Sequence, residues 1–250
     1  MLKDTIVSPA VYNSLPHISE VSEAPKTHSA DLAELRTLLS KHDVPSSVSV
    51  RLIHKHFDVS DGEVMAFKQV PAPPFGEVIV MRPERTAHDL PLHGLNYFVD
   101  SEGVMQAYEY TTDETMDMAP YLSFLTDFCA LVTRKGLQMK FGLKLSAKEV
   151  STAATEFEYP HLRSTITIPQ GLPEPEILDD EGVITEWKGM ASGDPKKLFC
   201  LMHVQTCNQH CQNHSGRGEN EPVGEWYLGG QNLVPGSEVY KLVRAVVEAW

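Results

Sequence analysis

Cysteine is scarce in this chain, which has four cysteines among 250 residues. They are Cys129, Cys200, Cys207 and Cys211, and three of them lie close together. This number and spacing exclude the disulfide framework of a small secreted protein. The opening residues, MLKDTIVSPAVYNS, also lack the basic and apolar regions of a secretion signal. We therefore expect reduced thiols and a cytoplasmic protein.

Long apolar runs and an excess of basic residues are also missing. No stretch approaches the roughly 18 apolar residues of a membrane span. Lysine and arginine number 21 against 34 acidic residues, which gives a net charge of −13. Because nucleic-acid affinity rests largely on basic side chains that neutralise phosphates, this balance argues against DNA, RNA and anionic membranes as partners. A small-molecule partner is expected, and the oligomeric state is left open.

Several catalytic signatures are absent as well. The chain has no Rossmann glycine fingerprint, P-loop, His-Glu-x-x-His helix, Gly-x-Ser-x-Gly elbow or kinase motif set. A serine triad assembled from residues scattered along the chain stays open.

Apolar periodicity predicts three amphipathic helices. They begin at Ser29, Pro120 and Ser237, and they end before Pro45, at Gly136 and at the C-terminus. Residues 1–28 contain three prolines and no sustained period, which fits an arm lying over the domain or a partly disordered leader. Residues 29–250 are expected to form a single domain. The acidic, proline-rich loop 169–182 is a possible subdomain boundary.

Most other segments read as strands because β-branched and aromatic residues alternate with polar ones. The predicted strands are 47–57, 63–70, 76–81, 95–100, 103–110, 140–145, 162–168, 183–188, 197–206 and 224–228. Short turn sequences predict two hairpins, one joining 47–57 to 63–70 and one joining 95–100 to 103–110. The expected fold class is α+β, a mainly antiparallel sheet built from hairpins with about three amphipathic helices packed on it.

The first candidate site is the strand VSVRLIHKHF. Side chains alternate along a strand, so His54 and His56 are expected on one face, continuing the apolar row of Val48, Val50 and Leu52. Two imidazoles at this spacing can converge on one cation. The alternative is a pair of histidines that only form hydrogen bonds with their neighbours.

The second candidate is the segment HVQTCNQHCQNH. Its potential metal ligands are His203, Cys207, His210, Cys211 and His214. Thiolate and imidazole are the ligands that zinc prefers, although the spacing is not that of a known zinc finger. A polar loop with one buried cysteine is the alternative.

Our hypothesis joins the two segments around one transition metal, most simply zinc. Nitrogen-rich ligation with an open position would indicate a catalytic ion, whereas closed coordination with two thiolates would indicate a structural one. The glycine-rich continuation supplies Arg217 as a substrate clamp and Glu219 as a general base.

At RLIHKHFDVSDGEVMAF and GLNYFVDSEGVMQAYEYT the chain resembles uncharacterised proteins of filamentous ascomycete fungi. In these proteins a similar His-Lys-His-Phe segment precedes a turn and a Glu-Val strand, and the resemblance covers residues 45–145. It carries no established activity, so no functional residue is transferred. It implies a fungal origin and, by association, a place in specialised metabolism.

These observations lead us to expect a metal-binding enzyme that acts on a small organic molecule as a hydrolase, lyase or isomerase. Two alternatives stay open. One is a non-catalytic interaction module whose Cys/His segment holds a structural zinc. The other is a metal-free enzyme that uses histidine for acid/base catalysis.

Overall fold

The computed structural model of the protein describes residues 2–3, 5–72, 77–86, 91–146, 154–159, 162–169, 185–189, 227–228, 231–232 and 245–246. The helices in these ranges are α1 (Pro9–Asn13), α2 (Ile18–Val21), α3 (Ala24–Thr27), α4 (Ser29–Lys41) and α5 (Leu122–Lys135), the last preceded by a 3-10 turn at Ala119–Tyr121. The strands are β1 (Leu2–Lys3), β2 (Val48–Leu52), β3 (Glu63–Pro71), β4 (Glu77–Arg85), β5 (His93–Val99), β6 (Met105–Thr111), β7 (Phe141–Leu145), β8 (Ala154–Tyr159), β9 (Ser164–Pro169), β10 (Glu186–Trp187), β11 (Tyr227–Leu228) and β12 (Gln231–Asn232).

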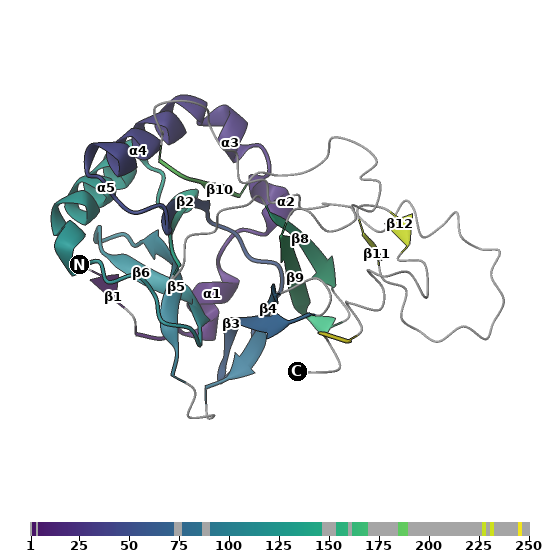
Figure 1. Ribbon diagram of the computed structural model, residues 1–250. Helices are drawn as coiled ribbons and strands as arrows, with labels where there is room; N and C mark the ends of the chain where they lie inside the picture. Colours follow the sequence, from purple (N-terminus) through teal and green to yellow (C-terminus); the bar gives the residue numbers. More distant parts are fainter. Residues whose placement is uncertain are drawn as a thin grey trace, which may run out of the picture.

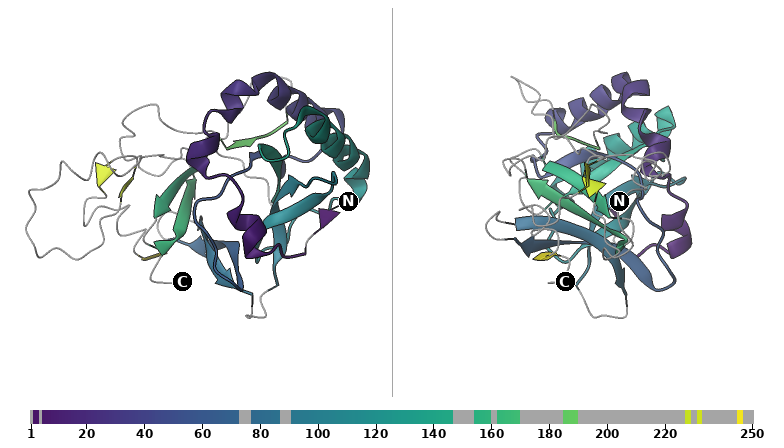
Figure 2. Two further views of the ribbon diagram at one scale, coloured as in Figure 1. Left: turned by 180° about the vertical axis from the view of Figure 1, so that it is seen from behind. Right: turned by 90° about the vertical axis from the view of Figure 1, so that its right-hand side faces the viewer.

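One large sheet dominates the described residues. Its strand order is β10-β2-β7-β5-β6-β3-β4-β9-β8, with β1 added beside β6. Most neighbours are antiparallel, and the exceptions among the paired strands are β1 with β6 and β3 with β6. The sheet curls, as Figures 1 and 2 show, and the helices lie against it. The predicted α+β class with a mainly antiparallel sheet is confirmed.

Of the two predicted hairpins, one is confirmed and one is wrong. Strands β5 and β6 pair through the turn Asp100–Gly103, where Gly103 takes a positive φ of 78°. Strand β2 does not pair with β3, because β2 lies between β10 and β7 while β3 pairs with β4 and β6. The polar turn DVSDG therefore links strands that occupy different parts of the sheet.

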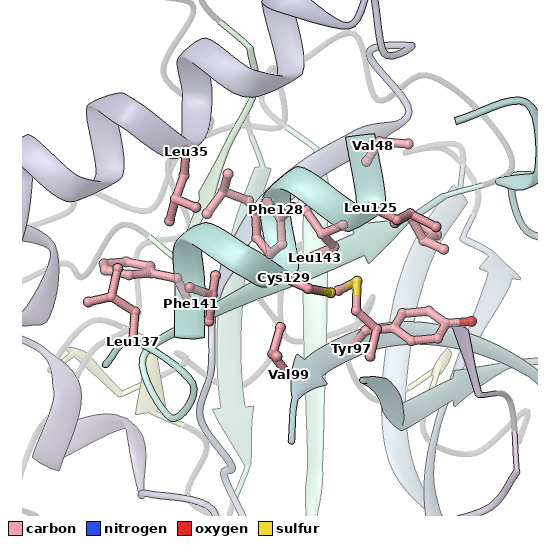
Figure 3. Packing of buried hydrophobic residues seen from close by; sticks show 14 of the residues in the cluster. Leu35, Val48, Tyr97, Val99, Leu125, Phe128, Cys129, Leu137, Phe141 and Leu143 are labelled. Atoms are coloured by element: carbon pink, nitrogen blue, oxygen red, sulfur yellow. The ribbon is translucent and has the colours of Figure 1, made fainter. Parts of the chain in front are cut away.

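Helices α4 and α5 lie side by side over the outer face of the sheet near β2, β7 and β5 (Figures 1 and 2). Figure 3 shows Leu35 of α4 and Phe128 of α5 in the buried cluster that also contains Val48, Leu143 and Val99 of the sheet. The helices predicted from Ser29 and from Pro120 are present as α4 and α5. Helix α5 ends where Gly136 adopts a left-handed φ of 66°. Of the predicted C-terminal helix, only Ala245 and Val246 lie within the described residues, and both are helical.

Residues 5–28 lie over the domain. Helix α1 buries Tyr12 and is followed by the buried Leu15, while α2 buries Ile18 and Val21. Pro9 sits in the first turn of α1, where its missing N–H has no cost. Pro9 and Pro25, which read as breakers in the sequence, thus lie in the first turns of two short helices.

The inner face of the curled sheet has its own apolar cluster. Its members are Tyr12, Leu15, Ile53, Val59, Met65, Phe67, Met81, Leu95, Phe98 and Tyr108. A row of polar residues runs beside this cluster, because strand register places Ser49, Lys144, Asn96 and Glu109 next to one another on four successive strands. The inner face therefore combines apolar and charged groups. No helix among the described residues is long and apolar enough to cross a membrane.

Candidate metal site

The two histidines of the His-Lys-His segment lie just beyond the end of β2. The strand is shorter than the predicted 47–57, because β2 ends at Leu52 and the next residues bond to other segments: Ile53 N–H donates to the Lys140 carbonyl and Lys55 N–H to the Pro16 carbonyl. The histidines therefore do not continue the row of Val48, Val50 and Leu52, which faces the helices. They lie instead with groups of the inner face. His54 is 1% exposed and His56 is 4% exposed.

Lys55, between the two histidines, points away from them. Its ammonium contacts the Asn13 carbonyl oxygen and the Asp58 carboxylate, and its side chain lines a surface groove of about 670 Å³ together with His17 and Met139. The alternation within His-Lys-His thus separates a buried pair of imidazoles from a cation at the surface.

The hydrogen bonds of His54 fix its tautomer. Its Nδ1 lies 2.8 Å from the Leu52 carbonyl oxygen, and because a carbonyl only accepts, Nδ1 must carry the proton. Burial, with the nearby charges of Arg51 and His56, holds the pKa of His54 well below its usual range, so the ring is neutral. Its Nε2 then has a lone pair, and this buried atom has no hydrogen-bond partner in the described part of the chain. An imidazole whose other nitrogen is fixed by a carbonyl is typical of metal-binding histidines.

His56 lies against its neighbour and two carboxylates. The centroids of the His54 and His56 rings are 5.0 Å apart. The Nδ1 of His56 lies 3.5 Å from Glu158 Oε2, and its Nε2 lies 3.7 Å from Glu156 Oε1 without a hydrogen bond to any described residue. Burial lowers the pKa of His56, but Glu156 and Glu158 outweigh burial, and the net shift is upward.

Glu156 reaches this site from the far end of the sheet. Strand β8 is the last in the strand order and β2 the second, and the curl of the sheet brings them together. The carboxylate is 2% exposed, accepts a 2.8 Å hydrogen bond from the Thr165 hydroxyl, and lies 3.8 Å from Nη2 of Arg51. Arg51 is held in turn by its Nη1, which donates to Thr185 Oγ1 over 3.1 Å.

Together, His54, His56 and Glu156 form a group that can hold a metal ion. One potential ligand atom from each residue lies within 4.8 Å of the other two, and all three residues are buried. Since zinc–nitrogen and zinc–oxygen bonds are about 2.0–2.2 Å, bound ligand atoms would lie roughly 3–3.5 Å apart, and the side chains would close by about 1 Å. Two histidines and one carboxylate leave coordination positions for water or substrate, as in catalytic zinc and non-haem iron sites.

A bulge in β6 adds further polar groups to the inner face. Tyr97 pairs with Ala107 and Asn96 with Glu109, so Tyr108 is an extra residue in the ladder. Glu109 accepts hydrogen bonds from the Asn96 amide at 2.6 Å and from the Tyr12 hydroxyl at 3.5 Å. Burial raises the pKa of Glu109, and the Arg51 charge opposes this shift without cancelling it.

The structure brings together part of the predicted site. His54 and His56 lie side by side, as the hypothesis requires. The other proposed residues, His203, Cys207, His210, Cys211, His214, Arg217 and Glu219, lie outside the described residues. The sequence-based interpretation missed Glu156, because no strand was predicted at 154–159. The alternation of Glu156 and Glu158 with Phe157 and Tyr159 was the available signal for that strand.

Comparison of the chain with protein-family models, curated proteins and solved structures finds no match.

Proposed function

We propose that this protein is a metal-dependent enzyme acting on a small organic molecule, with a divalent transition metal held by His54, His56 and Glu156. One observation carries the proposal: the buried His54, His56 and Glu156 each offer one ligand atom within 4.8 Å of the other two, and neither imidazole Nε2 has a hydrogen-bond partner in the described residues. Buried polar groups almost always have partners. A cation would bind the lone pair of the neutral His54 ring, and on His56 it would take the place of the proton that Glu156 and Glu158 favour. Zinc is the first choice for this ligand set, and ferrous iron is the alternative.

Such an ion would supply Lewis-acid chemistry. It would polarise a carbonyl or lower the pKa of a bound water, which serves hydrolase, lyase and isomerase reactions alike. Around it, the chain contributes the Leu52 carbonyl and Glu158, which orient the two rings, and Arg51 and Thr165, which orient Glu156. We extend the proposal to fungal specialised metabolism, and this extension is supported by the sequence resemblance alone.

The test is the metal content of the untagged full-length protein, measured by mass spectrometry after dialysis. We expect about one equivalent of metal in the wild type. Metal affinity should be at least about 100-fold lower in His54→Gln and His56→Gln, since losing a group that merely orients a ligand already costs about 10–100-fold. His42→Gln is the matched control, because His42 pairs with Asp127 of α5, 3.0 Å away, and takes no part in the ligand group.

A Cys207→Ser and Cys211→Ser double variant separates the rival functions. If that variant loses the metal and unfolds while His54→Gln keeps it, the proposal fails and the structural-zinc module takes its place. If the wild type binds no metal under reducing, metal-supplemented conditions, the proposal also fails, and histidine acid/base catalysis becomes the working hypothesis.

A further inference from the structure

The three proposed ligand residues are closed off from solvent. His54 is 1% exposed, His56 4% and Glu156 2%. Protein interiors are close-packed and hold few voids larger than a water molecule, so an ion cannot pass freely through them. A metal site needs an entry path. Some element around these three residues must therefore move when an ion or a substrate reaches the site in the folded protein.

The residue between the two histidines bonds to the N-terminal segment through each of its polar groups. Lys55 N–H donates to the Pro16 carbonyl over 2.9 Å, and the Lys55 carbonyl accepts from the Ile18 N–H over 3.2 Å. The Lys55 ammonium contacts the Asn13 carbonyl oxygen. These partners belong to residues 12–18, which we call the strap and which link α1 to α2 (Figure 1).

The strap has a second attachment three residues beyond His56. The Asn13 side chain donates from its amide nitrogen to the Val59 carbonyl and accepts from the Val59 N–H, both over 2.9 Å. This side chain thus pairs with a backbone as a neighbouring strand would. Tyr12 and Leu15 of the strap, each 2% exposed, pack in the apolar cluster of the inner face. The strap therefore joins the inner face to the segment that carries both histidines.

The seam between the strap and Lys55 faces solvent. The surface groove of about 670 Å³ is lined by residues 13–17 of the strap and, among others, by Lys55. Within the strap only Tyr12, Leu15 and Ile18 are buried, so moving it disturbs a small part of the core. Segments with few buried apolar contacts and hydrogen bonds near solvent are those that open locally, without global unfolding.

We propose that the strap is a gate over the metal site: it parts from Lys55 and Val59 to admit the ion and the substrate, and it closes again behind them. The segment that the strap holds also carries two of the ligands. A metal that fixes His54 and His56 should therefore favour the closed strap, and opening should limit the rate at which metal leaves. This inference rests on the proposed function, because the strap needs a metal site to cover.

Amide hydrogen exchange of the metal-free protein, measured residue by residue by NMR, tests the opening itself. We expect the amides of Lys55 and Val59, corrected for intrinsic rates, to exchange at least about ten-fold faster than that of Ile53. Ile53 is the matched reference, because its N–H donates over 2.8 Å to the Lys140 carbonyl, which lies outside the strap. Exchange at Lys55 and Val59 that is no faster than at Ile53 would overturn the inference.

The rate at which zinc-loaded protein loses its ion to excess EDTA tests the role of the opening. Asn13→Ala removes both bonds to Val59, and because each lost bond should favour opening by about two- to ten-fold, we expect release about ten-fold faster. Asp100→Ala is the matched control. Asp100 likewise accepts two 2.9 Å bonds, from the N–H groups of Glu102 and Val104 in the β5–β6 turn, and its loss should leave the release rate unchanged.

The outcomes separate this inference from the proposed function. If zinc binds but Asn13→Ala releases it no faster than the wild type, or if Asp100→Ala speeds release as much, the strap is not the gate while the metal site stands. If the wild type binds no zinc, the proposed function itself fails and the inference falls with it.

Discussion

His56 Nε2 and Glu156 Oε1 lie 3.7 Å apart, although they come from opposite ends of the sheet. Six strands separate β2 from β8 in the strand order, and the curl of the sheet closes the gap. A metal bound here would link the two ends of the sheet directly. Metal binding and folding stability should therefore be coupled.

The first prediction concerns this coupling. Added zinc should raise the melting temperature of the wild type, because a ligand present at 100 times its Kd stabilises the native state by about 2.7 kcal/mol. Glu156→Gln should abolish the increase, since the amide is a poor ligand. Glu63→Gln is the control, because Glu63 pairs with Arg163 over 2.9 Å and takes no part in the ligand group. A zinc-induced rise of equal size in Glu156→Gln and the wild type would contradict the coupling.

The second prediction concerns Glu186 at one end of the polar row. It accepts 2.8 Å hydrogen bonds from the Ser49 hydroxyl and the Lys144 ammonium. Burial raises the pKa of Glu186, but Lys144 and Arg51 outweigh it, and the net shift is downward. Glu186 therefore stabilises the protein when the pH is above the pKa of an unfolded glutamate. This contribution is lost as the pH falls through the lower pKa of Glu186 in the folded state.

Glu186→Gln should thus destabilise the protein at neutral pH by about 1.5–3 kcal/mol, with a smaller loss in acid. Urea unfolding at pH 7 and pH 4 measures this difference, and the exposed Glu114→Gln provides the control. A loss of equal size at both pH values would show that the carboxylate charge contributes nothing.

The sequence predicted features that depend on local pattern. The apolar stripe from Phe124 to Val132 defined α5, and the turn Asp100–Gly103 defined the β5–β6 hairpin. It also placed His54 and His56 in one site, because residues two apart stay close in any extended segment. These inferences needed no knowledge of the tertiary fold.

Features that depend on long-range pairing were not accessible in this way. Strand β2 pairs with β7 and β10 rather than with β3, and its residues Val48, Val50 and Leu52 belong to the core under α4 and α5. Glu156 meets His56 only because the sheet curls, and Tyr108 turns inward only because of a bulge. Such relationships are set by register and curvature, which alternation alone does not encode.

The third prediction concerns the close approach of β5 and β7. A Cβ on Gly142 would overlap the Tyr97 carbonyl oxygen, which is backbone and cannot move aside alone. Gly142→Ala should therefore cost about 1–3 kcal/mol or more through overpacking. Gly62→Ala is a useful comparison, because Gly62 has a φ of 76° and a Cβ added there would meet no atom within 4 Å. Its cost of about 1 kcal/mol therefore comes from the backbone alone. Equal losses in urea unfolding would argue against the steric explanation.

The fourth prediction compares Glu109 with Glu186, because the pKa values of these two buried carboxyls shift in opposite directions. Burial raises the pKa of Glu109 above that of an unfolded glutamate. Because the pKa is higher in the folded state, this carboxyl stabilises the protein when the pH is below the pKa of the unfolded state. That stabilisation is lost as the pH rises through the pKa of the folded state. A tenfold difference in the acid dissociation constant between the folded and unfolded states corresponds to about 1.4 kcal/mol.

Glutamine at position 109 cannot ionise, so Glu109→Gln should escape this loss. Its amide oxygen can accept from Asn96, and its NH₂ can donate to the Tyr12 hydroxyl, which acts as donor or acceptor. We expect the stability of the variant relative to the wild type to increase as the pH rises from weakly acidic to neutral, the opposite of the trend for Glu186→Gln. Urea unfolding of both variants across this range tests the signs together. A common trend would mean that the two buried carboxyls ionise alike, despite their different partners.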